Sequence, residues 1–136
     1  MSFCRISILT DNFVNKPGLQ GEHGFSCLIQ GGERNILFDT GCGGLFAKNA
    51  HRMNIELYGV DDIVLSHGHY DHTGGVAEAL DVAPGAGLVC HDLTLERRYS
   101  RRSGEPVPRS IGMPEASINA INTAIAAGRS CRHVES

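Results

Sequence analysis

The chain has 136 residues, of which 41% are hydrophobic and 20% are charged, and both fractions are ordinary for a folded globular protein. This length fits one domain, residues 1–136, and the net charge of −3 argues against a nucleic-acid-binding module. No apolar run is long enough to span a membrane, and the N-terminus lacks the features of a signal peptide, so we expect a cytoplasmic location.

The first part of the chain predicts three strands and a helix. Residues 4–9 alternate between apolar and polar side chains, as a half-buried strand does. Residues 24–30 and 35–39 are two apolar segments separated by a Gly-Gly turn, which predicts a hairpin. Residues 45–53 carry apolar side chains at the spacing of an amphipathic helix.

The middle of the chain predicts a strand at residues 63–65, a helix at 75–80 and a strand at 87–90. Strand, helix and strand in this order favour a parallel pair within one sheet. The stretch 97–109 follows with five arginines, Ser-Gly and two prolines, and we expect it to be an irregular loop that could act as a lid.

The clearest helix is predicted at residues 114–127, where proline suits the start and Gly128 can end it. Ile118, Ile121 and Ile125 lie on one face, which we expect to be buried in the core. A further strand is predicted at 129–134.

The five cysteines are dispersed and include no Cys-x-x-Cys pair, so we expect them to be reduced. Cys4, Cys27 and Cys90 sit inside apolar runs and are predicted to be buried. Cys42 lies near the candidate site described next, and a structural role is favoured for it over a reactive one.

The densest group of metal-ligating residue types is Ser-His-Gly-His-Tyr-Asp-His-Thr-Gly-Gly at residues 66–75. In an extended segment His67, His69 and Asp71 would point one way and His72 the other. His67 and His69 could then share one ion, and Asp71 with His72 could hold a second. Imidazole and carboxylate without a nearby thiolate favour zinc. The alternative is a histidine-rich surface turn.

This motif resembles the HxHxDH signature of the metallo-β-lactamase superfamily, and other segments are similar to the branch that includes the dihydropterin ribofuranosylaminobenzene phosphate synthases. These segments are Thr10-Asp11-Asn12, Glu22-His23-Gly24-Phe25-Ser26, Phe38-Asp39-Thr40-Gly41, His91 with Arg98-Tyr99-Ser100, and Ile111-Gly112-Met113-Pro114. The resemblance implies an α/β fold, an αββα sandwich, and catalysis by a metal-bound hydroxide. Members of the family have a later Gly-Cys-x-His-x-Gly stretch and a C-terminal histidine that this sequence lacks. We therefore expect the N-terminal half of the sandwich, a mixed sheet flanked by helices.

The resemblance also implies roles for residues outside the motif. Asp39 would lie under the metal site and hold a ligand or the loop backbone, although a turn-capping aspartate is equally compatible. His91 would be a substrate contact or an ordinary residue at a strand end. Independently of the resemblance, Arg101 and Arg102 suit a phosphorylated or otherwise anionic substrate, because guanidinium groups bind phosphate through paired hydrogen bonds; a solvated basic loop is the alternative.

Two classes of function follow from these residues. The first is a zinc-dependent hydrolase-type or pterin-synthase-like enzyme, with one or two metal ions, in which Asp71 both ligates and orients the attacking hydroxide. The second is an inactive half-domain that needs a partner, either a second copy or a complementing C-terminal half, to complete the metal site. An anion-binding module built on the arginine loop is a third, weaker possibility.

Overall fold

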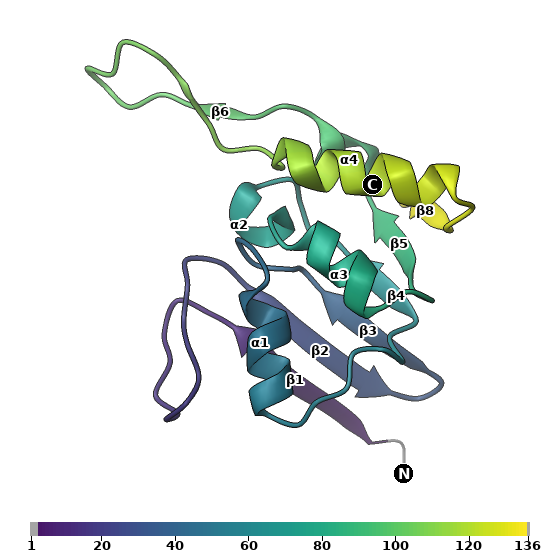
Figure 1. Ribbon diagram of the computed structural model, residues 1–136. Coiled ribbons are helices and arrows are strands. Elements are labelled where there is room, and N and C mark those ends of the chain that lie inside the picture. Colours follow the sequence, from purple (N-terminus) through teal and green to yellow (C-terminus); the bar gives the residue numbers. More distant parts are fainter. Residues whose placement is uncertain (1–2, 136) are drawn as a thin grey trace.

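The computed structural model describes residues 3–135, which contain a six-stranded mixed sheet in the order β1-β2-β3-β4-β5-β8 (Figure 1). The strands are β1 (Cys4–Thr10), β2 (Ser26–Gly31), β3 (Arg34–Phe38), β4 (Asp62–Val64), β5 (Gly87–Cys90) and β8 (Cys131–His133). The strands β1, β2 and β3 pair antiparallel, whereas β3, β4, β5 and β8 run parallel. The predicted hairpin and the predicted parallel pair are both confirmed, and so is the α/β class.

Three helices cover one face of this sheet and lie in front of it in Figure 1. They are α1 (Leu45–Arg52), α3 (Val76–Val82) and α4 (Glu115–Ala126). Shorter elements are the single-turn helix α2 (Tyr70–Thr73), the 3-10 helix η1 (Asp92–Leu95), and the strands β6 (Tyr99–Ser100) and β7 (Arg109–Ser110), which pair with each other. None of the helices in the described part of the chain is long and apolar enough to cross a bilayer.

The core lies between the sheet and its helices. Leu28, Leu37, Ile63 and Leu88 are cross-strand neighbours in one row, and each is at most 2% exposed. Because side chains alternate between the two faces of a strand, this row places one buried apolar residue of each of these strands against the helix layer.

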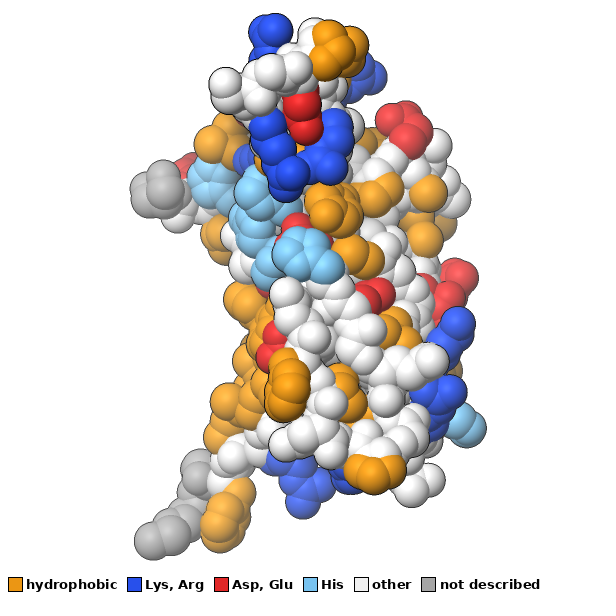
Figure 2. All heavy atoms as spheres, turned by 90° about the vertical axis from the view of Figure 1, so that its left-hand side faces the viewer, with side chains coloured by type: hydrophobic (Ala, Val, Ile, Leu, Met, Phe, Trp, Pro, Cys, Tyr) orange, Lys and Arg blue, Asp and Glu red, His pale blue; other side chains and the backbone are white. Residues whose placement is uncertain are grey.

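The opposite face of the sheet carries a second apolar row. Ile8, Phe38, Val64 and Val89 belong to it, and Ile8, on the edge strand, is 47% exposed. Figure 2 shows hydrophobic side chains along its hollowed left-hand edge, the side away from the helices. Residues 3–135 thus form one layer of helices on one sheet, with the other sheet face open.

Three expectations from the sequence are wrong in detail. Cys4 is exposed, because it lies on the edge strand β1. Ile125 is 43% exposed, because it lies in the last turn of α4, whereas Ile121 is buried as predicted. The basic stretch 97–109 is not wholly irregular, since β6 and β7 make it a hairpin that projects from the body of the molecule (Figure 1).

Candidate metal centre

The site begins where two parallel strands end together. Phe38 of β3 and Val64 of β4 are paired, so the chain segments that follow them emerge at the same edge of the sheet. Asp39 lies there with 1% exposure and a positive φ of 55°. Its carboxylate accepts hydrogen bonds from the backbone N–H of Ser66, at 2.8 Å, and from the Ser66 hydroxyl, at 2.6 Å.

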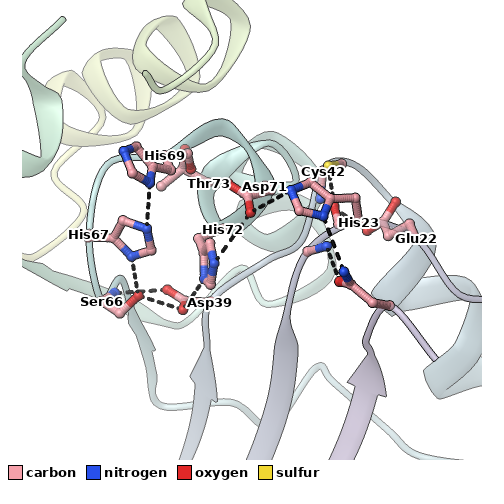
Figure 3. Close-up of polar contacts among 12 residues, drawn as sticks. Glu22, His23, Asp39, Cys42, Ser66, His67, His69, Asp71, His72 and Thr73 are labelled. Carbon is pink, nitrogen blue, oxygen red and sulfur yellow. Dashed lines mark hydrogen bonds and ion pairs between the residues drawn. The ribbon is translucent and has the colours of Figure 1, made fainter. Parts of the chain in front are cut away.

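Asp39 also determines where the protons of two imidazoles reside (Figure 3). The Nδ1 of His72 donates to Oδ2 of Asp39 at 2.8 Å, because a buried carboxylate can only accept. Since the Ser66 hydroxyl donates to Asp39, its oxygen accepts from Nδ1 of His67, 2.9 Å away. Both histidines therefore carry their proton on Nδ1 and present a lone pair on Nε2.

The Nε2 atom of each of these two histidines lies near one further side chain of the motif that could bind a metal. Nε2 of His67 accepts a hydrogen bond from Nδ1 of His69 at 3.0 Å, and Nε2 of His72 is 3.6 Å from Oδ2 of Asp71. Ligands 2.0–2.1 Å from a tetrahedral zinc ion are separated by about 3.4 Å, and the two observed separations, 3.0 Å and 3.6 Å, lie on either side of this value. The chemistry and spacing of the pairs therefore suit zinc.

These pairs do not make a closed site by themselves. Among residues 3–135, no group of three or more histidine, cysteine, aspartate or glutamate side chains is arranged to hold a metal ion. The rings of His67 and His72 are nevertheless neighbours, with centroids 4.3 Å apart, so the two pairs are adjacent. The described residues thus place two pairs of candidate ligands next to each other.

The local backbone differs from the extended segment that the sequence predicted. The helix α2 begins at Tyr70, so Asp71 and His72 lie on a helical turn instead of alternating along a strand. The hydroxyl of Thr73 donates to the carbonyl of His69 and supports this turn. The turn brings Nδ1 of His72 back toward Asp39, a contact that an extended chain would not make.

The electrostatics of the site favour a neutral imidazole at His67. Burial lowers its pKa, and the neighbouring His72 and His69 lower it further, while Asp39 and Asp71 act in the opposite direction. Metal ions bind the neutral form of histidine, so the net direction of this shift suits a ligand.

Beside Asp71 lie His23, which was not selected as a site residue from the sequence, and Cys42, for which a structural role was predicted. Nε2 of His23 lies 3.4 Å from Oδ2 of Asp71, and the Cys42 thiol donates to the carbonyl of His23 at 2.6 Å (Figure 3). Burial raises the pKa of Cys42, and the charges of Glu22 and Asp71 raise it further, which suits an unreactive thiol. The Glu-His-Gly segment was visible in the sequence, but its contact with Asp71 depends on a long-range approach.

The residues predicted to bind substrate are not joined to this cluster by any hydrogen bond or ion pair within residues 3–135. Nδ1 of His91 accepts from the backbone N–H of Leu93 and caps η1. Arg101 and Arg102 lie on the turn of the β6–β7 hairpin, where both bond to Glu105. Their proposed roles remain predictions.

The chain is therefore an α/β protein that presents paired imidazole and carboxylate groups, a candidate metal centre, beyond the carboxyl ends of its parallel strands. The family model described as the metallo-beta-lactamase superfamily matches residues 19–125. The chain belongs to this superfamily, and the resemblance predicted from the sequence is confirmed.

Two relatives and one solved structure are similar to the chain. An uncharacterized protein of Methanocaldococcus jannaschii is 37% identical over 99 residues, 71% of this chain and 38% of that protein. The 7,8-dihydropterin-6-methyl-4-(beta-D-ribofuranosyl)-aminobenzene-5'-phosphate synthase of the same organism is 44% identical over 82 residues, 53% of this chain and 26% of the synthase. A proposed metallo-beta-lactamase from Thermotoga maritima, 14% identical, shares the fold with a TM-score of 0.55, over 98% of this chain and 59% of that one. The chain thus spans 38% and 26% of the two relatives' lengths.

Proposed function

We propose that the chain carries half of the metal centre of a zinc-dependent hydrolase-type enzyme that acts on a small anionic substrate. The observation that carries this proposal is the Asp39 network, which leaves a lone pair on Nε2 of both His67 and His72. Membership of the metallo-beta-lactamase superfamily supports chemistry of the hydrolase type. The 44% identity to a pterin-related phosphate synthase supports a phosphorylated substrate as one candidate.

Each residue of the centre has a separate task in this proposal. His67 and His69 would hold one ion, and Asp71 and His72 a second. When bound, such ions supply Lewis acidity and lower the pKa of coordinated water. Asp39 keeps the imidazoles in the tautomer that binds metal, and Asp71 accepts a hydrogen bond from the attacking water and so orients it.

The remaining ligands must come from further polypeptide, because a catalytic zinc ion usually has three protein ligands. We propose that a second copy of the chain or a complementing C-terminal half supplies them by packing on the open sheet face. Exposed apolar surface on that face supports this proposal. The competing function is a half-domain that is inactive by itself.

Metal content and hydrolysis test the enzyme proposal. If a second copy of the chain completes the centre, we expect the purified chain to retain zinc and to cleave a generic phosphodiester or ester, and His69→Ala to lose both properties. His51→Ala is the matched control, because His51 is exposed on α1 outside the metal centre. A wild-type chain that retains no zinc supports the inactive half-domain.

The partner proposal is tested by a charge on the open sheet face. Ile8→Asp should weaken self-association or binding of the complementing half in sedimentation experiments. Ile125→Asp places the same charge at a similarly exposed isoleucine on α4, 43% against 47%, and should change neither. A wild-type chain that sediments as a monomer rejects the second copy as the partner.

The anionic substrate is tested by replacing the two arginines of the hairpin. Arg101→Ala combined with Arg102→Ala should weaken the binding of phosphate-bearing ligands, because guanidinium groups bind phosphate through paired hydrogen bonds. His91→Ala tests the third predicted substrate contact in the same assay. If the double variant binds these ligands as the wild type does, the two arginines do not contact the substrate. The same result rejects the alternative of an anion-binding module built on them.

A further inference from the structure

His23 approaches the metal centre from outside the motif. Its Nε2 lies 3.4 Å from Oδ2 of Asp71, the oxygen that also faces Nε2 of His72 at 3.6 Å (Figure 3). At this place an imidazole can serve as a third metal ligand or as an N–H donor that positions the carboxylate. The two roles require opposite tautomers, since a ligand needs a lone pair on Nε2 and a donor needs a proton there.

A hydrogen-bond chain from the backbone selects between these tautomers. The N–H of Gly24 donates to Oδ1 of Asn12 at 3.0 Å, which fixes the orientation of the Asn12 amide. The amide NH2 group therefore faces Nδ1 of His23, 3.2 Å away. Because an amide NH2 can only donate, Nδ1 of His23 accepts, and the proton of the neutral ring is on Nε2.

The backbone around His23 is anchored to Asp71 and to the neighbouring loop. The N–H of Phe25 donates to the carbonyl of Asp71 at 3.2 Å, and the thiol of Cys42 donates to the carbonyl of His23 at 2.6 Å. Gly24 adopts a φ of 145°, and a Cβ at this position would collide with the carbonyl oxygen of Asp71. The side chain of His23 is 65% exposed, but its backbone is held on both sides.

We propose that His23 is a positioning residue that directs its Nε2–H to Oδ2 of Asp71, and that it is not a metal ligand. A donor on this oxygen restrains the carboxylate where it faces His72. The consequence for metal binding rests on the proposed function, whereas the tautomer and the restraint on Asp71 do not.

Nuclear magnetic resonance tests the tautomer directly in the full 136-residue chain. Long-range proton–nitrogen spectra should show the proton of His23 on Nε2, both without zinc and after zinc is added. In Asn12→Asp an acceptor replaces the amide NH2, and the proton of the neutral ring should move to Nδ1. A wild-type ring protonated on Nδ1, a metal-bound Nε2, or an unchanged tautomer in Asn12→Asp overturns the proposal.

Two substitutions of His23 separate positioning from simple packing. His23→Leu should weaken zinc binding about tenfold, the low end for a residue that supports a ligand, because His23 is exposed. His23→Gln retains an N–H donor and should restore affinity to within about twofold of the wild type. Equal affinities in the wild type and His23→Leu, or no rescue by His23→Gln, overturn the positioning role.

A wild-type chain that binds no zinc would favour the inactive half-domain over the proposed enzyme, and the role of His23 can still be tested in that protein. The carbon shift of the Asp71 carboxylate then becomes the measurement. It should move in His23→Leu and return in His23→Gln if His23 restrains Asp71. An Asp71 signal that is the same in all three proteins rejects the restraint.

Discussion

Asp39→Asn should move the proton of His67 and of His72 from Nδ1 to Nε2 while leaving the fold in place. Asparagine has the shape of aspartate and is among the residues that best tolerate a positive φ, which is 55° here. If its oxygen keeps the bond to the N–H of Ser66, its NH2 group faces the Ser66 hydroxyl and Nδ1 of His72. The Ser66 oxygen and Nδ1 of His72 then accept hydrogen bonds from this NH2 group. The Ser66 hydroxyl donates to Nδ1 of His67 instead, and the protons of the His67 and His72 rings move to Nε2.

The structure sets the size of this effect. Three hydrogen bonds to a carboxylate become bonds to a neutral amide, a loss of about 1 kcal/mol each, and the cheaper burial of the neutral group offsets part of it. We expect the free energy of unfolding to fall by about 1–2 kcal/mol. Zinc affinity should fall about 10–100-fold, because the ligand lone pairs of His67 and His72 are lost.

Urea denaturation, competition with a zinc chelator and long-range proton–nitrogen spectra measure these three quantities. Asp62→Asn is the matched control, because Asp62 is a buried aspartate of the same sheet whose ion pairs with Arg34 and Arg132 lie outside the motif. It should lose stability and keep its zinc affinity relative to the wild type. The reasoning is refuted if Asp39→Asn folds, keeps both protons on Nδ1 and binds zinc as the wild type does.

Two further predictions concern the surroundings of the centre. Gly24→Ala should lower the free energy of unfolding by more than about 3 kcal/mol, because a Cβ there meets the carbonyl of Asp71, whereas Gly18→Ala has open space and should cost only about 1 kcal/mol for its φ of 86°. Urea midpoints that are equal in the two variants would contradict this. In the folded protein at pH 8, iodoacetamide should modify exposed Cys4 well before Cys90, whose pKa burial raises to about 11. Mass spectrometry that finds equal rates would show that Cys90 is accessible.

The strands, the hairpin and the main helices could be predicted from local patterns. The strands are apolar segments separated by turn residues, and their apolar residues Leu28, Leu37 and Ile63 form a buried row across the sheet. The errors arose where burial depends on position within the sheet. Cys4 lies in an apolar run but on an edge strand, so its exposure could not be read from its neighbours in the chain.

The amino-acid sequence by itself determined the superfamily and the α/β class, and it predicted the candidate metal ligands His67, His69, Asp71 and His72, because a dense local motif carries its chemistry in residue type and spacing. Tertiary structure alone decided which atoms of these groups face one another and which nitrogen holds each proton. Those properties depend on Asp39 and on His23, which approach from other strands and loops. Hydrogen bonds between segments distant in sequence are set by the packing of the sheet, and no local pattern encodes them.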